Sequence, residues 1–234
     1  MSRPADPHAR AALIKAARKE FLRLGIQKAR IEDITTACGL SKGAFYLHFE
    51  SKEALFRGLV AQLSEGMDAL LERRTREEEA LYRKSGGPKK REAALPALQA
   101  LSRKNDREVL ELLWAERDIA AVLLGGSQGT EFEGVIWAMV DREVRRVSAS
   151  CDRLKKWGIC RPDVPSEIIG SMLIGSWMML LRHMTGLTEK PDLESWLDGL
   201  TRLVENGISP APAVPVAANT RRRSAPRTTL RSLP

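Results

Sequence analysis

Three short helical patterns lie within the first fifty residues, and their spacing constrains the fold more than any other feature of this chain. The first begins at Pro7, a residue suited to the first turn of a helix, and its apolar positions repeat until Gly25. The second covers residues 31–38 and ends at Gly39, and a third of about seven residues follows the N-cap Ser41. Three helices this close, with a glycine in the middle turn, predict a helix-turn-helix.

The rest of the chain has the pattern of longer helices. Apolar residues at helical spacing predict a fourth helix from Ser51 to about Tyr82, and further helices over 92–101, 105–124, 132–156, 166–186 and 192–206. Sustained alternation of apolar and polar residues is absent, so we expect an all-α protein. The predicted domains are a three-helix helix-turn-helix domain over residues 1–50, a larger helical domain over 51–208, and a disordered basic tail over 209–234.

Positive charge is concentrated at the two ends of the chain. Residues 1–48 carry nine Lys and Arg against four Asp and Glu, and residues 209–234 carry five arginines and no acidic residue. The intervening residues are close to neutral, so a polyanion such as nucleic acid is expected to bind the N-terminal part. The tail arginines either add non-specific affinity for DNA phosphates or form a solvated end.

The third helix has the residues that a helix needs to enter the major groove of DNA. Gly43 and Ala44 let the backbone approach base edges closely, and Lys42 can donate to a base edge or to a phosphate. Phe45 and Phe49, four residues apart, are expected to anchor this helix to the other two. Donors expected near the phosphates are Tyr46, His48 and Lys52.

These residues resemble the N-terminal DNA-binding domain of the TetR family. The shared pattern includes Gly25, Asp33-Ile34, the run from Cys38 to Phe49, and Ser51-Lys52-Glu53. The resemblance implies an all-helical homodimer whose larger C-terminal domain binds a small molecule. It also implies that Tyr46, His48 and Lys52 clamp phosphates, and that residues around Ser41, including Lys42, Gly43, Ala44 and Leu47, face bases.

One position departs from the family pattern. TetR-family members usually place Thr or Ser at the start of the second helix, where it caps the helix and touches a phosphate, but Ala29-Arg30 stand there in this chain. Arg30 can supply the phosphate contact by its charge but cannot accept helix N–H bonds. We expect water, Glu32 or Asp33 to satisfy those N–H groups.

The apolar run from Ile168 to Leu181 is too short for a membrane span, which needs roughly twenty apolar residues, and indicates a buried helix. It is either an interior helix or a dimer seam in which small residues let two helices approach. The family builds its dimer from its last two helices, and this favours the seam. The expected interface residues are Gly170, Ile174, Gly175, Trp177, Met178, Leu181, Trp196, Leu197, Leu200 and Leu203.

A ligand cavity is the least constrained prediction. Five residues on two neighbouring predicted helices can supply apolar walls and a few polar groups: Trp114, Arg117, Asp118, Trp137 and Met139. The alternative is that they are ordinary core or surface residues.

The sequence favours a DNA-binding transcriptional regulator, most simply a repressor released from a pseudo-palindromic operator by a small-molecule effector. The alternative keeps DNA binding but makes the C-terminal domain a protein-interaction module without a ligand. An enzyme is not expected, because the chain has no catalytic motif, cofactor loop or Cys/His metal spacing. Three scattered cysteines and the absence of an apolar signal core indicate a cytoplasmic protein.

Overall fold

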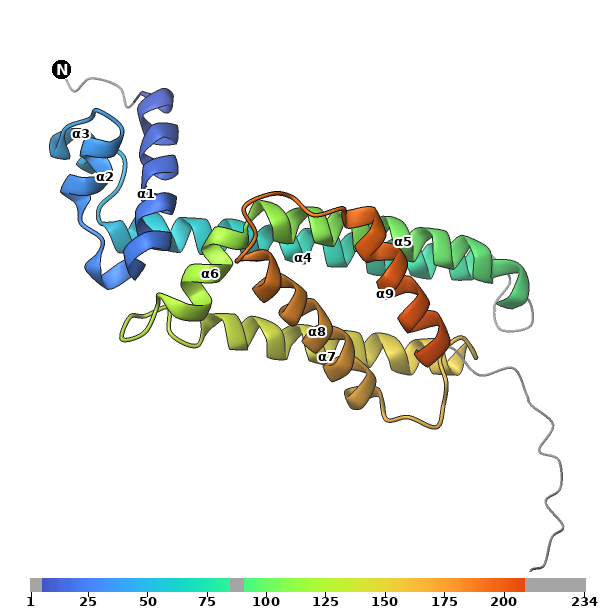
Figure 1. Cartoon of the computed structure of the whole chain (residues 1–234). Coiled ribbons are helices and arrows are strands. Elements are labelled where there is room, and N and C mark those ends of the chain that lie inside the picture. Colours follow the sequence, from blue (N-terminus) through green and yellow to red (C-terminus); the bar gives the residue numbers. More distant parts are fainter. Residues whose placement is uncertain (1–5, 85–90, 209–234) are drawn as a thin grey trace, which may run out of the picture.

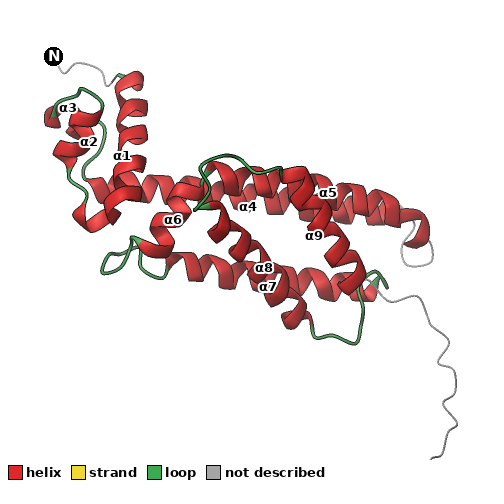
Figure 2. Ribbon diagram, viewed as in Figure 1, coloured by secondary structure: helices red, strands yellow, loops and turns green. Residues whose placement is uncertain are grey.

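The structure, a computed structural model, describes residues 6–84 and 91–208. All regular secondary structure within these ranges is helical, as Figure 2 shows. This confirms the all-α fold expected from the sequence. The predicted basic tail, residues 209–234, lies outside the described residues.

The helices of the described ranges occur in the following order: α1 (Pro7–Lys28), α2 (Ile31–Ala37), α3 (Lys42–Tyr46), α4 (Lys52–Lys84), α5 (Arg91–Ala115), α6 (Arg117–Gly125), α7 (Val135–Lys156), α8 (Ser166–Met184) and α9 (Leu193–Ile208). Helices α1 to α3 form a separate head at one end of the molecule, and α4 runs from this head into the bundle of α5 to α9 (Figure 1). The predicted helix-turn-helix and long fourth helix are therefore present.

The N-terminal helix begins and bends where the sequence indicates. The carboxylate of Asp6 accepts the backbone N–H of His8 at 2.9 Å and caps α1. At Gly25 the backbone has φ 72° and ψ 171°, which interrupts the helix before its last residues. A side chain at this position would be strained, because the left-handed region of φ favours glycine.

Helices α5 and α6 differ from the prediction. The sequence indicated separate helices over 92–101 and 105–124, but α5 continues without a break to Ala115. The polar stretch after residue 101 resembled a helix end, yet Asn105 within it is only 3% exposed and belongs to the helix. The break falls instead at Glu116, whose φ of −105° and ψ of 12° leave the helical region.

One apolar core joins the head to the bundle. Phe21 of α1 packs edge-to-face on Phe56 of α4 at 5.3 Å between ring centroids, and Phe56 packs likewise on Phe132 at 4.9 Å. All three side chains are almost fully buried. These three rings therefore form continuous close packing from the head to the loop after α6.

Helices α7 and α8 lie against each other at close range. A Cβ added at Gly170 of α8 would meet the Ser148 Oγ of α7 at 2.5 Å and the Val144 carbonyl oxygen at 2.9 Å. Only glycine fits there, so Gly170 serves packing within the chain.

Among the helices of residues 6–84 and 91–208, none has the length and apolar character that a membrane-spanning segment requires.

Candidate nucleic-acid interface

Helix α3 is held by one buried ring and presents its other large side chains to solvent. The Ser41 Oγ accepts the backbone N–H of Ala44 at 3.1 Å and caps the helix. Phe45 is fully buried, whereas Tyr46 and Leu47 are 50% and 59% exposed. Exposing two large side chains on a short helix costs burial energy, so this face is suited to contact with another molecule.

The backbone of α3 is also accessible. A Cβ added at Gly43 would find only the Ser41 Oγ nearby, at 3.7 Å. Gly39 adopts φ 71° in the turn that orients α3 relative to α2. This arrangement matches a helix that must approach base edges closely.

Lys42 has an acidic partner in the free protein. Its Nζ lies 2.6 Å from the Glu32 Oε1, and both side chains are more than half exposed. The hydrogen bond from Lys42 is the main cause that lowers the pKa of the Glu32 carboxyl. The same ion pair raises the pKa of Lys42. Lys42 must therefore exchange Glu32 for a DNA acceptor when it contacts DNA.

The start of α2 has the arrangement that the unusual Arg30 predicts. Arg30 occupies the N-cap position, and its side chain makes no capping hydrogen bond. Glu32 and Asp33 lie in the first turn of α2, where negative charge is favourable against the helix dipole. The Arg30 side chain is exposed on the same head and stays a predicted phosphate contact.

Lys52 has a structural role that the sequence did not suggest. Its Nζ donates to the backbone carbonyls of Gln27 at 2.9 Å and Ala29 at 2.8 Å, and its side chain is only 18% exposed. The ammonium thus caps the carbonyl end of α1, as cations do at helix C-termini. At most one of its three N–H groups is left for the phosphate contact predicted from the sequence.

A second set of polar contacts fastens α1 to α6. Arg18 donates through Nε and Nη2 to the two carboxylate oxygens of Asp118 at 2.7 and 2.5 Å, and Nη2 lies 3.0 Å from Glu116. These carboxylates, led by the Asp118 hydrogen bond, raise the pKa of Arg18. Bidentate pairs of this kind fix orientation as well as adding energy.

The end of α1 meets the end of α6 backbone to backbone. The N–H of Ile26 donates to the Gly126 carbonyl at 3.0 Å, and a Cβ at Gly25 would lie 2.8 Å from that same oxygen. Gln27 donates to the Gly129 carbonyl at 2.9 Å in the following loop. The head is therefore locked to α6 at several points along α1.

Comparison with known proteins identifies the head. The sequence profile of "Bacterial regulatory proteins, tetR family" matches residues 13–59, which span α1 to the first turns of α4. The head, over residues 13–59, is thus of the TetR family.

Curated relatives match this chain in the head region. It is 36% identical over 61 residues to the HTH-type transcriptional regulator TtgR of Pseudomonas putida, which covers 26% of this chain and 29% of that protein. It is 51% identical over 43 residues to the uncharacterized HTH-type transcriptional regulator YerO of Bacillus subtilis, covering 18% of this chain and 15% of that protein. The chain thus spans less than a third of the length of these relatives.

Solved structures resemble the whole fold. NalD, the secondary repressor of the MexAB-OprM multidrug efflux pump in Pseudomonas aeruginosa, superposes with a TM-score of 0.55 at 20% identity, covering 86% of this chain and 97% of that one. The fatty acid degradation regulator FadR from Bacillus halodurans gives a TM-score of 0.57 at 17% identity, covering 88% and 98%. The likeness shows that these structures share the fold of this chain, including its α5 to α9 bundle.

The five predicted ligand residues do not all face one interior space. Asp118 is engaged by Arg18 of α1, and the guanidinium of Arg117 stacks on the Trp114 ring at 3.7 Å. Trp137 is 56% exposed, so it cannot line an enclosed cavity of the single chain. Met139 packs on the main core. The role of all five residues in ligand binding stays a prediction.

Part of the predicted dimer face of α8 is covered within the single chain. Gly170, Met178 and Leu181 are buried within the chain and pack on its own helices. The exposed residues of α8 follow another face and recur at helical spacing: Ile168, Met172, Gly175 and Met179. We call these four residues the α8 stripe.

On α9 the exposed apolar side chains lie toward its end. Leu203 is 75% exposed and Val204 is 36% exposed, while Leu197 is buried. Trp196 stacks on His183 of α8 with ring centroids 5.7 Å apart, and Trp177 packs on the main core. Leu203 therefore remains a predicted interface residue, whereas Leu197 belongs to the core. Ile174 and Leu200 are half-buried and keep their predicted place at the interface edge.

Proposed function

We propose that this chain is a sequence-specific DNA-binding transcriptional regulator that acts as a repressor. The observation that carries this proposal is the α3 surface, where Tyr46 and Leu47 are exposed beside Lys42 on a helix anchored by the buried Phe45. A rigid scaffold that presents exposed donors on a short helix is the arrangement a major-groove reader needs.

The reading unit is proposed to be a homodimer. The α8 stripe and Leu203 of α9 form apolar surface that a second copy of this chain would cover. Two heads related by twofold symmetry read a pseudo-palindrome, with a half-site spacing set by the dimer.

The effector is proposed to be a small molecule that binds within the α5 to α9 bundle. Release from DNA requires that the effector bind better to a state whose heads are wrongly placed. Arg18, Ile26 and Gln27 join α1 to α6 and to the loop after it, and these contacts provide the connection by which a change in the bundle can reposition the head.

Footprinting on the promoter of its own gene tests the proposal. We expect protection of an inverted repeat, and loss of protection when the effector is present. Uniform protection of any DNA, without a preferred sequence, would contradict the regulator assignment. A thermal-shift panel tests the effector separately, because a compound that binds the folded state raises the melting temperature. A panel without any stabilising compound favours a C-terminal protein-interaction module.

A further inference from the structure

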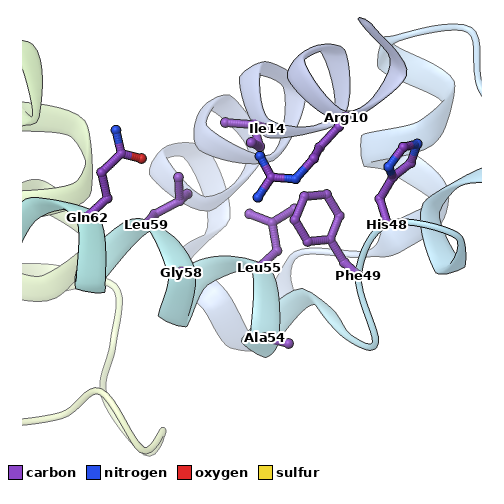
Figure 3. A pocket seen from close by; sticks show the side chains of 9 residues that line it. All are labelled: Arg10, Ile14, His48, Phe49, Ala54, Leu55, Gly58, Leu59 and Gln62. Atoms are coloured by element: carbon purple, nitrogen blue, oxygen red, sulfur yellow. The ribbon is translucent and has the colours of Figure 1, made fainter. Parts of the chain in front are cut away.

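A hollow opens on the head between α1, the turn after α3, and the start of α4. Its volume is about 200 Å³, and Figure 3 shows the nine residues that line it. Ile14, Leu55 and Leu59 provide apolar walls. The hollow extends along α4 past Gly58, where an added Cβ would meet no atom within 4 Å. The lining residues are Arg10, Ile14, His48, Phe49, Ala54, Leu55, Gly58, Leu59 and Gln62.

Two nitrogen-bearing side chains flank a single ring at one end of this hollow. The guanidinium carbon of Arg10 lies 5.3 Å from the centroid of the Phe49 ring, and the His48 ring lies 6.3 Å from it (Figure 3). The face of the Phe49 ring attracts the Arg10 cation and limits where its guanidinium can point. Phe49 is in turn fixed against the buried Phe45, with centroids 5.6 Å apart.

Arg10 has no acidic partner among the residues whose side chains the structure describes. Two other cations of the head are engaged, since Arg18 pairs with Asp118 and Lys42 pairs with Glu32. A guanidinium that is held in place on a ring, but has no carboxylate, presents its N–H groups to an external acceptor.

We propose that Arg10 binds a phosphate of the DNA backbone, on the same strand as the phosphate at His48, with Phe49 as its positioning residue. This rests on the proposed function and extends the DNA contact from α3 onto α1. His48, which lines the hollow, directly follows the exposed Tyr46 and Leu47 in the chain, so a strand that contacts α3 would pass close to it. DNA suits the site because the N-terminal part carries an excess of positive charge and the hollow is open.

The test is the salt dependence of DNA binding, measured for the full chain on an operator duplex and on a duplex of unrelated sequence. Loss of one phosphate contact lowers the slope of log K against log salt by about one per protomer. We expect Arg10→Gln to lower the slope by this amount on both duplexes and to weaken both by the same factor, because a phosphate contact carries no sequence information. Arg10→Lys keeps the charge and should retain most of the slope.

The matched control is Arg107→Gln. It removes the same charge from an exposed arginine of α5, which pairs with Glu194 of α9 and belongs to the bundle rather than to the head. Its slope should equal that of the unaltered protein. Phe49→Leu as a single change should lower the slope, but it should not lower the slope of Arg10→Gln any further. If the ring were merely structural, Phe49→Leu would weaken DNA binding equally in the unaltered protein and in Arg10→Gln. Thermal melts confirm that each variant is folded.

A slope for Arg10→Gln equal to that of the control overturns the proposal. If that result is accompanied by a saturable shift of the His48 ring resonances on titration with inorganic phosphate, the hollow is a site for free anions instead. Failure of the unaltered protein to prefer the operator contradicts the regulator assignment, and the slope on the unrelated duplex still decides the role of Arg10. A protein that binds neither duplex contradicts both.

Discussion

The guanidinium of Arg18 in α1 donates hydrogen bonds to both carboxylate oxygens of Asp118 in α6, at 2.7 and 2.5 Å. The two residues are a hundred positions apart in the chain, and each side chain is less than a quarter exposed. This contact joins the DNA-binding head to the bundle at a point where neither partner is fully solvated.

The first prediction concerns the energy of this contact. A double-mutant cycle with Arg18→Gln and Asp118→Asn, followed by urea unfolding, should give a coupling energy of roughly 1 to 2 kcal/mol. The exposed pair of Arg23 with Glu20 within α1 provides the comparison and should couple by less than about 1 kcal/mol. Equal coupling energies in the two pairs would show that the contact between α1 and α6 stabilises the protein no more than an exposed ion pair does.

The second prediction concerns the backbone junction at Gly25. Gly25→Ala should destabilise the protein by about 2 kcal/mol, because its φ of 72° disfavours a side chain and the new Cβ would lie 2.8 Å from the Gly126 carbonyl. Gly58→Ala is the control, since it sits within α4 with open space around it and should stabilise by up to about 1 kcal/mol. Thermal unfolding without DNA measures both. An unchanged stability of Gly25→Ala would mean that the junction between α1 and α6 accommodates a side chain at no cost in free energy.

The third prediction concerns assembly. Met172→Glu places a charge in the middle of the α8 stripe, at a side chain that is 68% exposed in the single chain. We expect a folded monomer by light scattering, with unchanged helicity, since burying an unpaired charge in the dimer is strongly unfavourable. Leu22→Glu, on an equally apolar side chain of α1 that is 52% exposed, should remain a dimer. Dimers in both variants would remove the α8 stripe from the interface.

The fourth prediction is an alkaline loss of stability. Burial raises the pKa of the Cys151 thiol to about 11, above its ordinary value of 9.0. The folded state therefore holds this proton more tightly, so its contribution is complete below pH 9.0 and is lost as the pH rises towards 11. The loss should be on the order of 2 kcal/mol by urea unfolding. The alkaline loss of stability should be smaller in Cys151→Ala. An identical loss in the two proteins would show that another group causes it.

The sequence predicts the head better than the bundle for a physical reason. In the head, special residues determine local geometry, as Gly25 and Gly39 determine turns and Ser41 determines a cap. Such signals depend on a few neighbouring atoms and can be read from a short stretch of chain. The uncapped start of α2 at Arg30 was predictable in the same way.

Burial of the bundle helices depends on their neighbours, which the sequence does not show. Helix α8 is apolar on nearly every face, so the pattern could not separate Met178, which packs inside the chain, from Met172, which is exposed. Lys52 illustrates the same limit, because its partners are the carbonyls of Gln27 and Ala29, more than twenty residues away. Arg10 was missed because only the fold brings it over Phe49.

The fifth prediction tests the central claim directly, by selection of bound sequences from a pool of random duplexes. The unaltered protein should enrich an inverted repeat, and Lys42→Ala should change the preferred base at one position of each half-site. Tyr46→Phe should weaken binding to every sequence by the same factor, because it removes a donor expected at a phosphate. Enrichment of no common sequence by the unaltered protein would contradict the assignment of α3 as a reading helix.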